Sequence, residues 1–186
     1  NDKRNTHRFL QGVPLMPTQF AEPSQKMIRT AFPCVVKPAF GHGGDRVTLT
    51  ENQAELDAAL QAISPLPALV QEKASDAGKD LRVYVLFGEI VAAVLRTAAA
   101  GIVSNYKRGG SVKLHTLTRG ERELATEVIR KFASANAPLS FAGVDLIYHH
   151  GKPVVNEIED VVGSRMLYEV SDLDVIALYA EGLARA

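Results

Sequence analysis

The chain has 186 residues, enough for one sizeable domain or two small lobes with a real core. Hydrophobic residues make up 46% and charged residues 23%, with 21 basic against 21 acidic side chains, so no global field would attract nucleic acid or an anionic membrane. Aromatic residues are sparse at 6% and tryptophan is absent, which also weakens any base-stacking surface.

The sequence shows no apolar run of the ~18 residues that a membrane-spanning helix needs, and no signal peptide is visible. The single cysteine, Cys34, excludes an internal disulfide framework and fits a reducing compartment, so we expect a cytoplasmic protein. Apolar neighbours predict that Cys34 is a buried strand residue and not a nucleophile, since no histidine lies near it in sequence.

Helical periodicity, strand alternation and turn residues predict the elements of the chain. The first half is expected to contain a helix from Asn1 or Asp2 to about Gln11, a short helix over 24–31, strands over 34–37 and 46–49 joined by a glycine-rich tip, a helix through Ile63 opened by a capping box at Thr50, and a strand over 68–72. The second half is expected to contain strands over 80–87 and 90–97, a helix over 119–135 capped by Thr118, strands over 142–148 and 154–159, and a helix over 172–184 capped by Ser171. Hairpins mixed with flanking helices indicate an α+β fold with a largely antiparallel sheet.

The strongest group of charged residues lies in the last expected hairpin. Asp145 interrupts an apolar strand, and alternation along the partner strand puts Glu157 and Glu159 on one face with Val155, and Asn156 on the other. A three-residue turn would bring Asp145 directly opposite Glu157, whereas a two-residue turn would miss by one. Three converging carboxylates without a companion Cys or His favour magnesium over zinc.

An alternative interpretation of these carboxylates is an acidic strand end in solvent, or one paired with Lys152 or Arg165. Upstream, Lys37 ends an apolar strand just before the glycine-rich tip. Its ammonium, together with backbone N–H groups at Gly43 and Gly44, suits phosphate binding. The segment is not a Walker P-loop, because GxxxxGK[ST] is missing, and an ordinary flexible hairpin is the alternative.

Two further segments have residues suited to a nucleotide. Glu72 and Lys73 lie at a strand end that could bind an adenine edge, with a plain charged strand end as the alternative. Arg82 and Arg96 lie on the two long strands, followed by a basic loop over 104–110. Arginines on strands are usually solvated, but basic residues aimed at one anion would stabilise phosphoryl transfer.

Taken together and in this order, these pieces resemble the ATP-grasp enzymes, specifically the RimK-like carboxylate–amine (glutamate) ligases. The resemblance runs from Lys3 to the C-terminus. Its most specific parts are Val35-Val36-Lys37-Pro38, Val70-Gln71-Glu72, Asp80-Leu81-Arg82, Ser104-Asn105 with Arg108-Gly109-Gly110, Ala142-Gly143-Val144-Asp145 and Val155-Asn156-Glu157-Ile158-Glu159.

The resemblance implies one ATP-grasp domain over residues 1–186, in which two α+β subdomains grip ATP. The smaller subdomain would span about 17–72, and the C-terminal one, with the metal site, 73–186. The implied cofactors are ATP and Mg²⁺, with Mn²⁺ as an alternative metal.

The resemblance also implies a role for each matching residue. Lys3 and Lys37, with Gly43 and Gly44, would contact phosphates; Glu72 and Lys73 adenine; Asp80 the ribose; Ser104 and Asn105 the nucleotide and metal-bound phosphate; Arg82, Arg96 and Arg108 the transferred phosphoryl group; and Asp145, Glu157 and Glu159 the metal. Glu159 falls where the family usually has Asn, so it is either a third ligand or the mark of a different substrate.

Enzymes of this family transfer the γ-phosphoryl group of ATP to a carboxylate, and an amine then attacks the acyl phosphate to give an amide. The implied partners are therefore ATP and a small-molecule carboxylate and amine, such as amino acids or peptides, with no nucleic acid and no membrane. A homo-oligomer is an open alternative.

Three departures from the family pattern limit how far the family's residue roles apply to this chain. The usual Asn and Ser-Pro-Gly stretch is replaced by residues 159–165, where we hypothesise that Arg165 receives a substrate carboxylate. The family's Arg before Ser-Asn is Val103. The usual N-terminal domain before the ATP-grasp fold, which helps to form the substrate cleft, does not precede Asn1, so we expect ATP binding without necessarily full activity.

Two other functions are kept as alternatives: kinase-like phosphoryl transfer without an amine acceptor, and a nucleotide-binding module without catalysis, as in synapsin-like proteins. Arg82, Arg108, Asp145 and Glu157 favour an enzyme, because binding alone needs fewer converging charges. We do not expect nucleic-acid binding through the basic residues Lys107, Arg108, Lys113, His115 and Arg119.

Overall fold

The computed structural model describes residues 2–24, 28–41, 43–99, 101, 110–160 and 162–185. In chain order its elements are α1 (Lys3–Phe9), β1 (Thr18–Ala21), β2 (Cys34–Pro38), β3 (Thr48–Thr50), α2 (Gln53–Ile63), β4 (Ala68–Glu72), β5 (Lys79–Leu86), β6 (Glu89–Thr97), β7 (Ser111–Leu114), α3 (Arg119–Ser134), β8 (Phe141–His149), β9 (Lys152–Asp160), α4 (Arg165–Val170) and α5 (Val175–Arg185). None of the described helices is long and apolar enough to cross a membrane.

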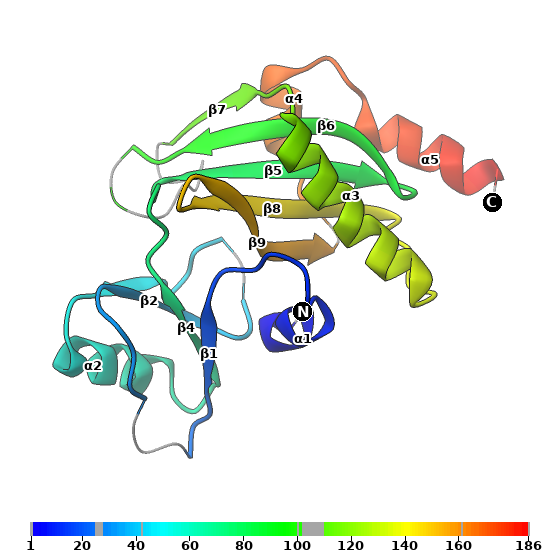
Figure 1. The fold of residues 1–186 in the computed structure, drawn as a ribbon. Helices are drawn as coiled ribbons and strands as arrows, with labels where there is room; N and C mark the ends of the chain where they lie inside the picture. Colours follow the sequence, from blue (N-terminus) through cyan, green and yellow to red (C-terminus); the bar gives the residue numbers. More distant parts are fainter. Residues whose placement is uncertain are drawn as a thin grey trace.

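The strands form two separate sheets, and every strand pair within them is antiparallel. The four-stranded sheet has the order β1-β4-β2-β3, and the five-stranded sheet has the order β7-β6-β5-β8-β9 (Figure 1). The chain crosses from the smaller sheet to the larger one through residues 73–78. The predicted α+β class with antiparallel pairing is therefore confirmed.

The smaller sheet is covered by α2, because the apolar residues of this helix recur on one face. Leu56, Ala59 and Ile63 are buried against strands β2 and β4 in one cluster, with Leu60 packed beside them. Cys34 is fully buried in the same cluster, as its apolar neighbours predicted.

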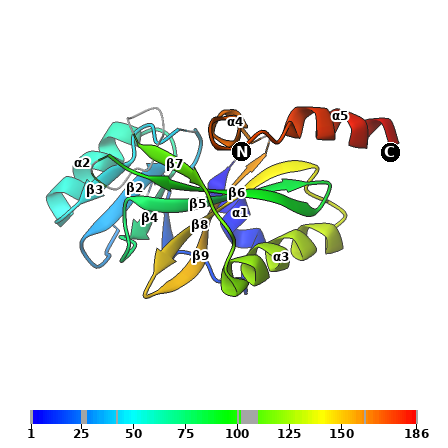
Figure 2. The same cartoon turned by 90° about the horizontal axis from the view of Figure 1, so that it is seen from above.

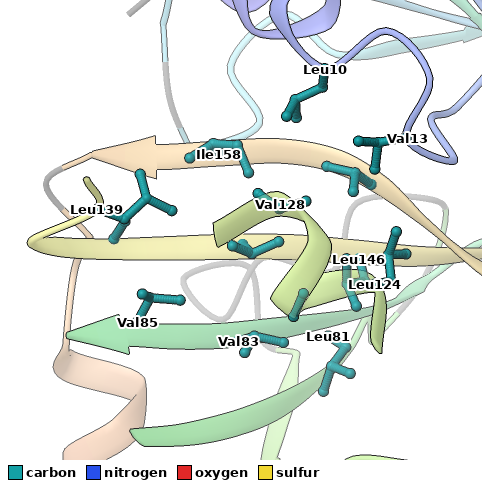
Figure 3. Packing of buried hydrophobic residues seen from close by; sticks show 14 of the residues in the cluster. Leu10, Val13, Leu81, Val83, Val85, Leu124, Val128, Leu139, Leu146 and Ile158 are labelled. Carbon is teal, nitrogen blue, oxygen red and sulfur yellow. The ribbon is translucent and has the colours of Figure 1, made fainter. Parts of the chain in front are cut away.

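The larger sheet is covered on both faces. Helix α3 lies on one side, and α4 and α5 lie on the other (Figure 2). Successive side chains of a strand point to opposite faces, so Val83 and Val85 face α3 while Tyr84 and Leu86 face α4 and α5. The α3 side also receives Leu10 and Val13 from the N-terminal segment, and Figure 3 shows this core from nearby.

The N-terminal segment ties the two sheets together. After α1, Met16 donates to the Val155 carbonyl and Val155 donates to the Pro14 carbonyl, so residues 14–16 run along the outer edge of β9. The next residues form β1 of the smaller sheet. A strand edge that would otherwise expose unpaired backbone groups is thus covered by this segment.

The hairpin β8–β9 combines the shorter of the two turn lengths considered above with the Asp145–Glu157 pairing expected of the longer one. Its turn has two residues, since His149 pairs with Lys152, yet Asp145 pairs with Glu157. A β-bulge reconciles these facts: Leu146 pairs with Val155, so Asn156 is the extra residue of β9.

The bulge also corrects the predicted faces of β9. Val155 and Ile158 both belong to the α3-side core, and Asn156, Glu157 and Glu159 line a cavity on the other side. Strict alternation had placed Val155 with the two glutamates and Asn156 opposite them. The extra residue breaks the alternation at that point.

Two predictions near the N-terminus were wrong. Residues 28–31 are not helical, so the short helix expected over 24–31 is missing from its described part. Helix α2 is capped by Asn52, whose side chain accepts a hydrogen bond from the Glu55 amide, and not by Thr50. Thr50 is instead the last residue of β3, where its hydroxyl donates to the Cys34 carbonyl.

The second half of the chain contains two elements that the sequence did not indicate, the edge strand β7 and the short helix α4. Both are too short for a period to emerge from the surrounding residues. The final helix begins at Val175, later than expected, and Asp174 rather than Ser171 accepts a hydrogen bond from an amide of its first turn.

Candidate functional site

One face of the five-stranded sheet is divided into an apolar part and a charged part. The apolar part is covered by α4 and α5. The charged part carries Arg82, Asp145 and Glu157, because each alternates with core residues of its own strand that point to α3. Asp80, Arg96 and Glu159 share this face by the same period.

A cavity of about 780 Å³ adjoins this charged part and is lined by residues of both sheets. Its size is within the range of small-molecule sites. The site residues expected from the sequence that line it are Lys3, Lys37, Gly43, Gly44, Glu72, Lys73, Asp80, Arg82, Arg96, Asp145, Glu157, Glu159 and Arg165. Ser104, Asn105 and Arg108, expected at the same site, lie outside the described residues.

Asp145 is the centre of a buried charge network. Its Oδ1 accepts from Arg82 Nε at 2.8 Å, and its Oδ2 accepts from Arg82 Nη2 and Arg96 Nη2, each at 2.7 Å. Burial by itself would raise the pKa of this carboxyl, but the two guanidinium charges outweigh burial and lower the pKa to about 2. Both arginines are buried, so the alternative of solvated strand arginines does not hold for them.

The same two arginines reach further carboxylates. Arg82 Nη1 lies 2.7 Å from Glu159, and Arg96 Nε donates to Asp80. Gly143 makes room for the Arg82 side chain, since a Cβ there would lie 3.3 Å from Arg82 Nε and 2.7 Å from Val162. Two guanidinium groups therefore face three carboxylates among the described residues.

Lys3 joins helix α1 to both sheets. Its ammonium lies 3.1 Å from Glu157 and donates to the Gly41 carbonyl at 2.7 Å, while its amide donates to the Ala39 carbonyl. The segment before the glycine-rich tip is thus fixed to α1 and to the acidic strand β9. The acidic end of β9 pairs with Lys3 and Arg82, and not with Lys152 or Arg165, the partners considered from the sequence.

Lys37 lies on β2 and is buried, and its ammonium donates to Asn156 Oδ1 at 3.1 Å. Burial lowers the pKa of this ammonium to about 8; the Glu157 charge opposes the shift and the Lys3 charge adds to it. Asn156 was not among the residues predicted for the site, because strict alternation would turn its side chain away from Glu157 and Glu159. A bulge leaves no signal in the residue types of this hairpin that could have revealed it.

The segment between the sheets forms another wall of the cavity, through Glu72, Lys73 and Ala74. Glu72 ends β4 as an exposed carboxylate 3.4 Å from His149 Nε2. Apolar side chains also line the cavity, among them Met16, Val35 and Ile147. Apolar walls with a few polar groups are typical of small-molecule and cofactor sites.

Comparison with known proteins gives a match to the RimK-like ATP-grasp domain over residues 15–181. The chain belongs to the RimK-like ATP-grasp family. The resemblance inferred from the motifs is thereby confirmed.

Relatives of this RimK-like chain include a probable alpha-L-glutamate ligase of Alcanivorax borkumensis, 34% identical over 178 residues, which cover 90% of this chain and 57% of the relative. The ribosomal protein bS6–L-glutamate ligase of Escherichia fergusonii is 34% identical over 147 residues, covering 77% of this chain and 47% of the relative. Among solved structures, D-cycloserine synthetase DcsG superposes with a TM-score of 0.79 at 19% identity, covering 99% of this chain and 69% of that one, which supports the fold. The chain thus spans about half the length of these two curated relatives.

The carboxylates of this RimK-like site can be tested for their fit to a divalent cation. In the described ranges no three His, Cys, Asp or Glu side chains lie close enough together to hold a metal ion. Glu157 and Glu159 nevertheless have the hard oxygen donors that magnesium prefers, face the cavity, and each make one ion pair. Asp145 uses three of about four lone-pair sites on arginines, so the two glutamates fit a cation better than Asp145 does.

Arg165 is an exposed residue at the start of α4 and lines the same cavity. No ion pair of its guanidinium is formed within the described part of the chain. It is therefore a cation at the rim of the site whose charge is available to a ligand.

Proposed function

We propose that this chain is the ATP-grasp part of an ATP- and magnesium-dependent carboxylate–amine ligase. The observation that carries the proposal is the cavity between the two sheets, in which four buried cations meet a row of carboxylates. In this proposal residues 17–72 form the smaller nucleotide-gripping subdomain and residues 73–186 the one with the metal site. The single buried cysteine is compatible with a cytoplasmic location, which stays a prediction.

The proposed nucleotide contacts follow the walls of the cavity. Lys3, Lys37 and the backbone at Gly43 and Gly44 would hold phosphate oxygens. Glu72 and Lys73 would border the adenine ring beside the apolar wall, and Asp80 would lie near the ribose. Ser104, Asn105 and Arg108 would complete the phosphate side, on the basis of the family pattern alone.

In the proposed reaction, a substrate carboxylate oxygen attacks the γ-phosphorus of ATP and ADP leaves; an amine then attacks the acyl phosphate carbon and expels phosphate, leaving an amide. Arg82 and Arg96 offset the charge that develops on the phosphoryl oxygens, and their rigid hold on Asp145 keeps their orientation fixed. Bound magnesium, held by Glu157 and Glu159 with Asp145 nearby, would neutralise phosphate charge. The chain itself mainly orients groups and excludes water.

The substrates are proposed from the relatives and from Arg165. Both curated relatives bear names that specify glutamate ligation, so L-glutamate is the first amine to test. The guanidinium of Arg165, which forms no ion pair with the described residues, would receive a substrate carboxylate. Arg165→Ala is then expected to raise the KM for the amino-acid substrate about ten-fold or more while the KM for ATP stays unchanged, and an unchanged amino-acid KM would refute this role.

The deciding experiment measures ADP and phosphate release by the full-length protein with ATP, Mg²⁺ and pairs of amino acids or peptides. A ligase releases ADP only when both a carboxylate and an amine are present. Release with a carboxylate alone would indicate kinase-like transfer, and ATP binding without any release would indicate a binding module. Glu157→Gln is expected to abolish the magnesium-dependent turnover; full turnover in this variant would refute the metal assignment.

A further inference from the structure

We propose that Asn156 is a positioning residue that holds the Lys37 ammonium toward the cavity without cancelling its charge, and thereby fixes a phosphate-binding cation between the two sheets. This inference rests on the proposed nucleotide function. Asn156 directly precedes Glu157, one of the proposed metal ligands, but has no carboxylate of its own.

The bulge of β9 is what brings Asn156 to the cavity. Asp145 pairs with Glu157 and Leu146 pairs with Val155, which leaves Asn156 without a partner residue on β8. Bulges of this kind redirect a side chain and are common beside active sites. Without the extra residue, Asn156 would take the place of a core-facing side chain.

The backbone around the bulge is held from its outer side. Val155 exchanges hydrogen bonds with Pro14 and Met16, and its side chain is fully buried in the α3-side core. Two residues later, Glu157 is held by Lys3 at 3.1 Å. Asn156 therefore sits between two fixed residues, and its side chain has a defined direction.

Lys37 differs from the other buried cations of the cavity in the partner that it has. Lys3, Arg82 and Arg96 each pair with at least one carboxylate. The Lys37 ammonium donates instead to the neutral amide oxygen of Asn156, its one hydrogen-bond acceptor among the described residues. An ammonium has three donors, so two remain for a ligand.

A neutral acceptor suits a cation that must bind an anion. It satisfies one donor of a buried ammonium, which would otherwise be costly to bury, and leaves the positive charge intact. A carboxylate in the same place would hold the ammonium as well but would repel phosphate. The contact also joins β2 of the smaller sheet to β9 of the larger one, so it fixes Lys37 relative to the acidic strand.

The test compares the affinities of ADP and adenosine for the full chain by isothermal titration calorimetry in the presence of EDTA, so that the neighbouring acidic residues bind no metal. Asn156→Leu removes the acceptor at similar volume and is expected to weaken ADP binding about ten-fold, since one charge-assisted hydrogen bond is at stake. Adenosine, which has no phosphate, should bind with wild-type affinity.

Lys37→Met supplies the matching arm of a double-mutant cycle. Because Asn156 acts through Lys37, the double variant Asn156→Leu/Lys37→Met should bind ADP no more weakly than Lys37→Met alone. The control is Asn5→Leu, an identical change on the exposed side of α1, which should leave both affinities unchanged. Wild-type ADP affinity in Asn156→Leu, equal losses for ADP and adenosine, or additive losses in the double variant would each overturn the inference.

Asn156→Asp keeps the test decisive if the leucine variant does not fold. It has the same size and an oxygen acceptor but adds a negative charge beside Lys37, so ADP affinity should fall about ten-fold with adenosine unaffected. Unchanged ADP affinity would contradict the role of a neutral acceptor. A wild-type chain that binds neither ligand would overturn the proposed function and this inference with it, whereas binding that is insensitive to residue 156 overturns this inference alone.

Discussion

Asp145 and its two arginines form a set of charges that is stable only as a whole. Asp145 is 4% exposed and Arg82 4% exposed, so water cannot replace a missing partner. Removing one member of a buried ion pair leaves an uncompensated charge, which costs far more than the intact pair contributes. The cavity is thus rigid where its charges are densest.

Replacement of the central carboxylate is expected to destabilise the fold strongly. Asp145→Asn should lower the free energy of unfolding by about 3 to 5 kcal/mol, because two buried guanidinium groups lose the carboxylate that they share. Urea denaturation followed by circular dichroism measures this. Asp57→Asn, on the exposed face of α2, should change stability by less than about 0.5 kcal/mol; a similarly small loss in Asp145→Asn would show that the network is not buried as described.

Gly143 is a second residue on which the site depends, because only a residue without a side chain leaves room for Arg82 and Val162. Gly143→Ala would place a methyl group 2.7 Å from Val162 and 3.3 Å from Arg82 Nε, so one of these neighbours must move. We expect a loss of about 1 to 3 kcal/mol in the free energy of unfolding, the usual cost of overpacking. Gly120→Ala in α3 meets nothing within 4 Å and should be neutral or stabilising in the same denaturation assay.

At the scale of an element, helix α1 connects the smaller sheet to the larger one. His7 on this helix is buried, and its Nε2 lies 3.4 Å from the side-chain Nε2 of Gln71 on β4. Burial, with a smaller effect of the Lys37 charge, lowers the pKa of His7 to about 4. The docked helix therefore favours the neutral ring.

This shift predicts a pH dependence. The unfolded chain binds the His7 proton more tightly, so the free energy of unfolding should fall as the pH goes from about 6.5 to about 4, by about 2 to 3 kcal/mol, and then level off for this group. His7→Gln should flatten this part of a stability–pH profile measured by urea denaturation. His150→Asn, at the exposed turn of β8–β9, should keep the wild-type slope; the same slope in His7→Gln would mean that His7 is not the group responsible.

Helices α3 and α2 show how far residue patterns alone can predict an element and its cap. Helix α3 was predicted nearly to its ends, because Thr118 and Glu121 form a complete capping box and one apolar stripe runs its length. Helix α2 was predicted from its stripe but with the wrong cap, because Thr50 and Asn52 are both good caps. Which of them is used depends on β3, since Thr50 is held in the sheet by Cys34.

At the scale of the molecule, the cavity exists because two sheets meet across residues 73–78 and the N-terminal segment. Polar contacts join the two sheets, such as Lys37 with Asn156 and Glu72 with His149. A ligand that touches both sheets should therefore add noticeably to their connection.

Nucleotide binding is accordingly expected to raise the thermal stability of the whole chain. ATP at about 100 times its Kd should add about 2.7 kcal/mol, which for a chain of this length raises Tm by roughly 5 to 10 °C. Differential scanning calorimetry with and without ATP measures the shift. Gln53→Ala, at the start of α2 and outside the cavity lining, should show the same shift as the wild type, and an unshifted wild-type Tm would contradict ATP binding.

Residue types and their periods were enough to predict the α+β class, most strands and helices, the family and many of the charged residues that line the cavity, because these features depend on local chemistry. The pairing of these charges depends on tertiary contacts. Asp145 and Glu157 face each other through a bulge and not through turn length, and Asp145 bonds two arginines from other strands. Register and burial arise from contacts between distant segments, so the partner of each charge, including Asn156 for Lys37, could not be read from spacing along the chain.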